Sequence, residues 1–363
     1  MAARKETGNG EAVTCPHDHT FGGQAVIEGV MMRGRHSWGV AVRRPSGGIA
    51  RVGYPLAPLG ARHRLLRLPI VRGVVSLYES LSLGIKALGI SANIGLEDSA
   101  SVSDGAYPDP ASPPTNPQVT TSDLVSDPAS APASALTPAP AAAKESPSFG
   151  WKELAVTVIV AVGMAVVLFV VIPLVVVKQF ESTFANPFVF NLVEGLIRIF
   201  IFILYIVGIS LIPDLRRVFQ YHGAEHKVIH AYESCGRPDA KHAGGYSTLH
   251  PRCGTGFLLL VMVIAVILFA IVGKPSLPWL VLSRIVGIPI IVGISYEIGI
   301  KWAGKHPDGF FARILLWPGI QLQRLTTREP TPDQLEVAAA ALEEVMRLDQ
   351  VEQGILGELP VQA

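Results

Sequence analysis

The chain has 363 residues, of which 49% are hydrophobic and only 16% are charged, and its mean hydropathy is +0.40. These values exclude an ordinary soluble protein and indicate an integral membrane protein. The net charge is +1 and no basic run is interleaved with aromatic residues, so nucleic acid is excluded as a partner.

The N-terminal part of the chain is expected to begin with a disordered segment over residues 1–20, which has charges but no apolar run and therefore cannot be a secretory signal. Residues 21–64 are expected to form a small β-rich cytoplasmic module. This module is predicted from two short strand-like stretches, 38–44 and 49–54, on either side of a Pro-Ser-Gly-Gly turn.

Residues 65–96 are apolar at helical spacing, but four charged residues make the segment too polar for a predicted membrane span. We expect one or two helices there, lying on the cytoplasmic interface or re-entering it. Residues 97–149 are dominated by Pro, Ala, Ser, Thr and Asp and cannot bury enough apolar surface to fold, so they are expected to be a disordered linker. The charges that interrupt the helical pattern of residues 65–96 are Arg67, Arg72, Glu79 and Lys86.

Residues 150–330 are expected to form a membrane domain with four transmembrane helices, because four apolar runs can each cross about 30 Å of hydrocarbon. Lys and Arg gather before the first run, between the second and third, and after the fourth, which predicts that both termini and the His-rich loop 213–254 are cytoplasmic. The runs are 154–177, 188–212, 255–272 and 277–300. The predicted fold class is thus a mainly α, polytopic membrane protein with a cytoplasmic β module and interfacial helices.

Charged residues inside the predicted spans are expensive and mark a function or a helix contact. At 1.5 Å per residue, Glu194 and Arg284 lie at a similar depth of about 10 Å from the outer face. We expect these two residues to pair, or Arg284 to compete with Arg198 for Glu194. Together with Glu297, they are interpreted as clamps between helices rather than as an ion pathway.

The C-terminal residues 331–363 are expected to be an amphipathic helix and a tail. Thr331-Pro332-Asp333-Gln334 supplies an N-cap, a proline at the first helical position and a glutamine at the third, which is a capping-box start.

The segment 221–230 contains three histidines and a glutamate, and it is where chemistry is expected. His222, His226 and His230 follow one another at intervals of four residues, so on a helix they share one stripe. The first and last lie about 12 Å apart, too far for one ion, so either His222 with His226 or His226 with His230 forms the pair. The pattern H-x-x-E-H favours the first pair and makes Glu225 the group that handles water.

A catalytic zinc needs a third protein ligand and an open position. The nearest supply is His250-Pro251-Arg252-Cys253, so the predicted metal ligands are His222, His226, His250 and Cys253, with Glu225 as the catalytic base. If all four residues bound one ion, the site would be closed and structural. Weaker candidates for ligands are Glu233 and Cys235.

Four motifs resemble those of a known family. They are similar to signatures of the YqhQ-like bacterial membrane proteins, a domain of unknown function, over nearly the whole chain except residues 1–20 and the linker. The resemblance implies a protein of the bacterial inner membrane and, by the family's description, a predicted metal-dependent enzyme without an assigned reaction. The motifs are 22–34, 221–233, 250–254 and 325–330.

Two functional hypotheses follow. The first is a multi-pass membrane protein with a divalent metal, expected to be zinc, at the cytoplasmic membrane face, which hydrolyses a membrane-embedded peptide or a lipid-linked substrate. The second is a non-enzymatic membrane factor, such as a biogenesis partner or scaffold, with a structural His/Cys site. The lipid bilayer is a partner in both, other membrane proteins are partners in the second, and the oligomeric state stays open.

Overall fold

The computed structural model describes most of the chain, and the expected disordered N-terminus and most of the expected linker lie outside the described residues. The described ranges are 21–103, 151–180, 186–236, 238–273, 277–305 and 309–352.

A four-stranded antiparallel sheet opens the fold, with its strands in the order β1-β2-β3-β4. The two predicted strands are present as β3 (Ser37–Arg43) and β4 (Ile49–Pro55). The glycine-rich stretch before them adds β1 (Gly22–Val26) and β2 (Gly29–Arg33), which the sequence analysis did not anticipate. Gly29 allows β2 to lie close to β3, because a Cβ at this position would lie 2.3 Å from the carbonyl oxygen of Ala41 on β3.

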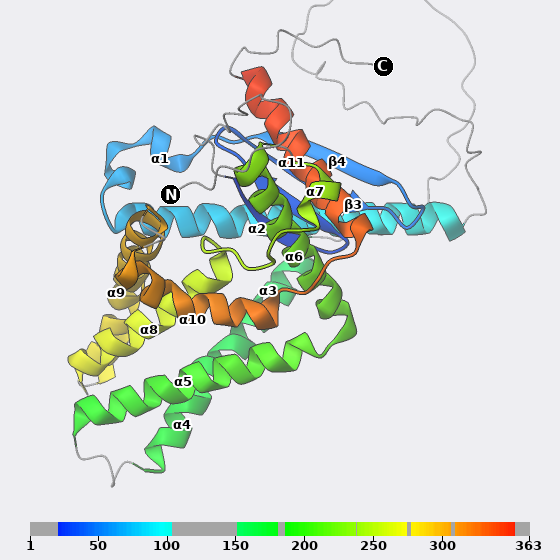
Figure 1. Cartoon of the computed structure of the whole chain (residues 1–363). Helices are drawn as coiled ribbons and strands as arrows, with labels where there is room; N and C mark the ends of the chain where they lie inside the picture. The colour runs from blue at the N-terminus through cyan, green and yellow to red at the C-terminus, as the bar shows by residue number, and fades with distance from the viewer. Residues whose placement is uncertain are drawn as a thin grey trace, which may run out of the picture.

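The sheet is covered on both faces, since successive side chains of a strand point to opposite sides. Met31 of β2 packs on one face against Leu83 of α2 (Val71–Ser103). The neighbouring Met32 packs on the other face against α6 (Pro213–Cys235) and α11 (Pro332–Glu352), which include Val228 and Leu342. Figure 1 shows α11 and α6 crossing the sheet together.

Five helical segments, one more than the four predicted, are long and apolar enough to cross a membrane by length and composition. The additional candidate is Val71–Leu96 within α2, where we expected one or two interfacial helices. A single helix forms because the interrupting charges are widely spaced, and two of them are paired: Arg72 with Glu297, and Glu79 with Arg33. α2 also continues to Ser103, into the stretch assigned to the linker.

The other four candidates correspond to the predicted spans. The first is α3 (Trp151–Val166), which continues through the π-helical turn Val167–Val171 into α4 (Ile172–Lys178). α5 (Pro187–Ser210) and α8 (Gly254–Val272) follow. The last is α9 (Leu277–Ser295) with the π-helical segment η3 (Tyr296–Trp302).

The remaining elements are short or amphipathic. α10 (Phe310–Thr326) lies against α8 and ends beside α6. The short ones are α1 (Leu59–Arg62), η1 (Arg64–Arg67), α7 (Ala240–Ala243) and η4 (Ala303–Lys305).

The charges within the spans form the expected cluster. Arg198 hydrogen-bonds to Glu194 one turn away, and Arg284 Nη2 of α9 lies 3.9 Å from Glu194 Oε2. The prediction that Arg284 competes with Arg198 for Glu194 is therefore confirmed. Glu297 has a partner that the sequence did not indicate, because Arg72 of α2 donates from Nε to its Oε1 at 2.6 Å.

Gly223 in the middle of α6 permits a close contact that the sequence did not reveal. A Cβ there would lie 2.1 Å from the carbonyl oxygen of Arg328, whose backbone N–H donates to Phe219 O at 2.9 Å. The chain after α10 is thereby held directly on α6.

We predict that Gly223→Ala destabilises the protein although alanine is the better helix former by about 1 kcal/mol. The added methyl group must push a backbone carbonyl away, and overpacking of this kind costs about 1–3 kcal/mol. Thermal melting of the purified protein in detergent measures the change. Gly89→Ala in α2 is the matched control, because its Cβ would meet open space, and it should melt at or above the wild-type temperature. Equal melting temperatures for the two variants would contradict the contact.

Candidate metal centre

The candidate site lies where α6 faces the segment that leads into α8. α6 begins with Pro213 at its first position and is capped after Cys235 by Gly236, which has a left-handed φ of +68°. Between these ends His222, His226 and His230 share one side of the helix, as the spacing predicted. The facing segment brings Cys253, the N-cap residue of α8, toward them.

Three of the predicted ligands converge. One ligand atom from each of His222, His226 and Cys253 lies within 4.8 Å of the others. His222 Nε2 is 3.2 Å from Cys253 Sγ, and the centroids of the two imidazole rings are 4.5 Å apart. Two histidine nitrogens and a sulfur form a donor set that zinc prefers.

The backbone fixes which nitrogen of each ring faces the cluster. Nδ1 of His222 lies 2.8 Å from the carbonyl oxygen of Thr326, and Nδ1 of His226 lies 2.5 Å from that of Thr248. A carbonyl oxygen can only accept, so both Nδ1 atoms carry hydrogen and both Nε2 atoms present lone pairs. A hydrogen bond from the second nitrogen to a carbonyl is the usual support of a metal-binding histidine.

The protonation states of the cluster also suit a metal. Burial lowers the pKa of His226, which keeps the ring neutral. Burial also raises the pKa of the Cys253 thiol, but the interactions with His226 and Thr255 outweigh it, so the pKa is lowered overall. Neutral imidazole and thiolate are the forms that bind metals.

Glu225 lies beside the cluster on α6 and is 5% exposed. Burial and the charge of Cys253 raise its pKa to about 8, against the opposing effect of His222. The carboxylate accepts a hydrogen bond from the backbone of Gly23, while Oε2 is buried without a hydrogen-bond partner. Gly23 lets β1 approach this closely, because a Cβ there would lie 2.9 Å from the Glu225 side chain.

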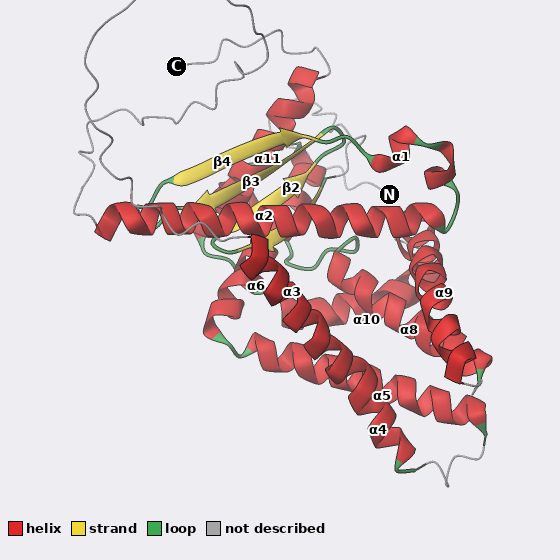
Figure 2. Cartoon of the chain, turned by 180° about the vertical axis from the view of Figure 1, so that it is seen from behind, coloured by secondary structure: helices red, strands yellow, loops and turns green. Residues whose placement is uncertain are grey.

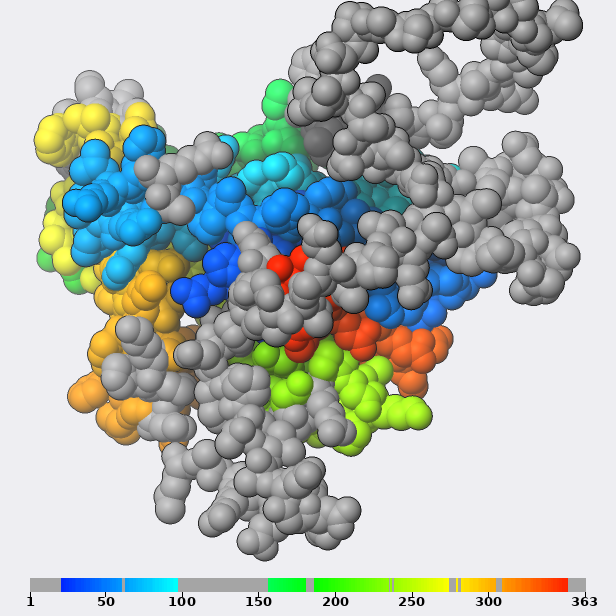
Figure 3. All heavy atoms as spheres, turned by 90° about the horizontal axis from the view of Figure 1, so that it is seen from above, coloured from blue at the N-terminus to red at the C-terminus, as the bar shows by residue number. Residues whose placement is uncertain are grey.

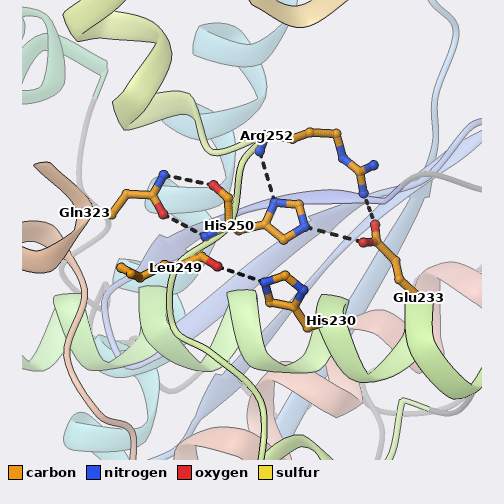
Figure 4. A network of polar contacts seen from close by, with 6 residues as sticks. All are labelled: His230, Glu233, Leu249, His250, Arg252 and Gln323. Atoms are coloured by element: carbon orange, nitrogen blue, oxygen red, sulfur yellow. Dashed lines mark hydrogen bonds and ion pairs between the residues drawn. The ribbon is translucent and has the colours of Figure 1, made fainter. Parts of the chain in front are cut away.

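The structure divides the predicted ligands between two neighbouring groups. His250 joins His230 and Glu233, and one ligand atom from each of these residues lies within 4.8 Å of the others. Figure 4 shows the three side chains together. The rings of His226 and His250, one from each group, have centroids 5.6 Å apart. Glu233, a weaker candidate, thus belongs to the second group, and the side chain of Cys235 lies outside what the structure describes.

Sequence reasoning missed Gln323 of α10, which holds the facing segment in place. Its Oε1 accepts from the backbone N–H of His250 and its Nε2 donates to the carbonyl of the same residue, both at 2.8 Å (Figure 4). Gln323 is 1% exposed. A glutamine among apolar residues of an amphipathic helix was the available signal, but nothing local indicated its partner.

Lys227 is a second anchor of the facing segment. Its side chain is nearly fully buried, donates to the carbonyl of Gly244 at 2.9 Å and pairs with Glu329. The chain on both sides of the site is thus tied to α6.

Comparisons with known proteins identify relatives without a described activity. A family model described as "Protein of unknown function (DUF1385)" matches residues 68–348. The chain is 29% identical over 333 residues to the "Uncharacterized protein YqhQ" of Bacillus subtilis (strain 168), which covers 91% of this chain and 93% of the relative. No solved structure matches.

We predict that Gln323→Leu loosens the segment that carries Cys253. The substitution leaves the buried N–H and C=O of His250 without partners, at about 1–3 kcal/mol for each group. A lower melting temperature and a weaker affinity for zinc in a competition titration should result. Gln321→Leu, the same change at a half-buried position of the same helix, is the control. Equal zinc affinities in the two variants would contradict the anchoring role.

Proposed function

The chain belongs to the DUF1385 family, as its motifs predicted. From the geometry of the His/Cys group we propose that it is a membrane protein with a zinc-dependent hydrolytic site. His222, His226 and Cys253 would hold the ion, and Glu225 would serve as general base. The substrate class that suits this place is a membrane-embedded peptide or a lipid-linked molecule.

The observation that carries the proposal is the unpartnered carboxylate oxygen of Glu225 beside a group of three ligands. Among the described residues, Glu225 and His250 are not members of the group within 4.8 Å, so the protein supplies three ligands and leaves a coordination position open. Three protein ligands with an open position are the pattern of catalytic zinc sites. A buried carboxylate next to that position is placed to accept a proton from water.

Each group then has a chemical task. A bound divalent ion supplies the Lewis acidity that makes water nucleophilic near neutral pH, and its charge favours the ionised form of a nearby carboxylate. Glu225 takes the proton of the attacking water, and the hydrogen bond from Gly23 fixes the orientation of its carboxylate. The carbonyls of Thr326 and Thr248 hold the two imidazole rings in the tautomer that binds metal.

A small cavity on the Cys253 side supports access for water. It measures about 20 Å³ and reaches Cys253 from between α8, η3 and α10, which is room for one water molecule. Most of its lining is apolar and comes from Phe257, Leu260, Ile300, Leu315, Leu316 and Ile320. This lining favours an approach from the membrane helices.

We also propose that α2 lies along the membrane surface and does not cross it. The sheet packs against both α6 and α11, so these three elements share one side of the membrane, and Figure 3 shows the N-terminal part and α11 on one face. Crossings by α3–α4 and α5 return the chain to that side, as do those by α8 and α9. A crossing by α2 would raise the number of crossings between the sheet and α6 to three. The sheet and α6 would then lie on opposite sides of the membrane. Figure 2 shows α2 between the sheet and α9.

The zinc content of the purified full chain tests the metal site. We predict that His226→Ala lowers it by about one equivalent per chain, because the ion loses one of three protein ligands. His242→Ala is the control, because His242 is exposed and pairs with Asp239. A wild-type chain without stoichiometric zinc, or equal zinc in both variants, would reject the site.

Glu225→Gln separates catalysis from metal binding. We predict that this variant keeps its zinc and its melting temperature but fails to restore the phenotype of a deletion strain, because removal of a general base lowers turnover on the order of 100-fold or more. The control is Glu336→Gln, which should restore growth. Glu336 is an exposed residue of α11 that pairs with Arg43 of β3.

A structural clamp is the second candidate function, and a specific observation favours it. The site joins four separate parts of the chain, namely α6, the segment before α8, the end of α10 and β1. A scaffold protein would use zinc in this way to hold its cytoplasmic module on the spans. Full activity of Glu225→Gln together with loss of folding on zinc removal would establish the clamp and exclude the hydrolase.

The placement of α2 predicts where the two termini lie. Fusions of green fluorescent protein to the N-terminus and to the C-terminus should both fluoresce, and alkaline phosphatase fusions at the same two points should both be inactive. Four crossings place both ends in the cytoplasm, whereas a fifth would place the ends on opposite sides. Opposite results at the two ends would show that α2 crosses.

A further inference from the structure

The polar stripe of α6 continues beyond the first ligand group. One turn after His226 it presents His230 and then Glu233, and His250 faces both from the segment before α8 (Figure 4). The rings of His230 and His250 have centroids 4.6 Å apart. We propose that His230, Glu233 and His250 form a second divalent-metal site, so that the protein holds two neighbouring ions. The first of these ions is the one in the proposed function, and the second site is argued independently of it.

Each residue of this second site offers one ligand atom to an ion, and His250 does so after a change of tautomer. His230 Nε2 lies 2.8 Å from the carbonyl oxygen of Leu249 and so carries the hydrogen, which leaves the lone pair on Nδ1. Glu233 uses Oε1 for Arg252, which leaves Oε2. His250 Nε2 is buried without a hydrogen-bond partner, 3.5 Å from Glu233 Oε2.

The burial of His250 favours an ion at its Nε2 atom. The residue is 4% exposed, and an unpaired polar nitrogen at such a position is costly. An ion between Nε2 and the carboxylate of Glu233 would satisfy both atoms. Two nitrogens and one carboxylate oxygen suit zinc and similar divalent metals.

The second site has better contact with solvent than the first. The side chains of Glu233 and Arg252 are 29% and 33% exposed, whereas His226 and Glu225 are nearly fully buried. Three protein ligands on the inner side and water on the outer side leave an open coordination position. The Arg252 guanidinium fixes the orientation of the carboxylate, as supporting groups of metal ligands commonly do.

Binding requires one change of tautomer. The backbone N–H of Arg252 lies 3.3 Å from His250 Nδ1, an arrangement that places the ring hydrogen on Nε2. When Nε2 binds an ion, this proton moves to Nδ1 and the long contact with Arg252 is lost. The proton stays on the ring, so the charge of the residue does not change.

Metal analysis of single variants tests the second site. The full chain is purified in detergent, stripped of metal, loaded with zinc and freed of excess. Wild type should hold about two zinc ions, His230→Ala about one, and His230→Ala combined with His226→Ala none. Glu233→Gln keeps the size of the side chain but loses its charge, so it should weaken binding of one ion only. His242→Ala should hold as many ions as wild type.

Cobalt as the probe distinguishes the two sites. Only the first has a thiolate ligand, so only the first should show thiolate-to-cobalt charge transfer. We expect His230→Ala to lose half of the cobalt and none of this band. One ion per chain, unaffected by His230→Ala and Glu233→Gln, would overturn the second site and leave the proposed function standing. No bound ion in wild type would overturn both.

Discussion

The burial of α6, a helix rich in polar side chains, is the constraint on which the rest of the structure depends. Between Tyr221 and His230 it carries three histidines, a glutamate and a lysine, yet it lies beneath the sheet, α11 and the segment before α8. Buried polar groups must find partners, so neighbouring chain segments are held where their carbonyls can accept. Thr326 and Thr248 accept from two of the histidines, and Gly244 accepts from Lys227. The arrangement of the sheet, α6 and α11 follows from these contacts.

The same constraint links the two ends of the chain. α11 covers the sheet from the far end of the sequence, where Asp349 accepts from Ser37 Oγ at 2.6 Å and Val345 packs beside it. Because α6 packs against both the sheet and α11, the apolar helices between these elements must lead the chain back to the same place. The membrane domain is therefore anchored through its loops as well as through contacts between its helices.

Local patterns in the sequence predicted the elements and the first ligand pair. The alternation in residues 38–44 gave β3, and the interval of four between His222 and His226 placed both on one side of a helix. Contacts between segments that are distant in the sequence produce no periodic pattern from which they could be predicted. Neither Gln323 nor Gly23 could be assigned a role before its partner was known. The division of His250 from Cys253 depends on the course of the facing segment. Whether α2 is one unbroken helix could not be settled either, because Arg72 and Glu79 have their partners elsewhere in the chain.

The direction of the imidazole lone pairs favours a metal at this cluster. A histidine that serves only the core has both ring nitrogens satisfied by protein groups. His222 and His226 each use Nδ1 on a carbonyl, and their Nε2 lone pairs then meet at one sulfur. The single S–H hydrogen of Cys253 can satisfy only one of them, and Thr255 Oγ1 lies 3.1 Å from the same sulfur. A cation is the partner that satisfies two imidazole lone pairs and a thiolate at once, which is why this cluster is explained better by a bound ion than by packing.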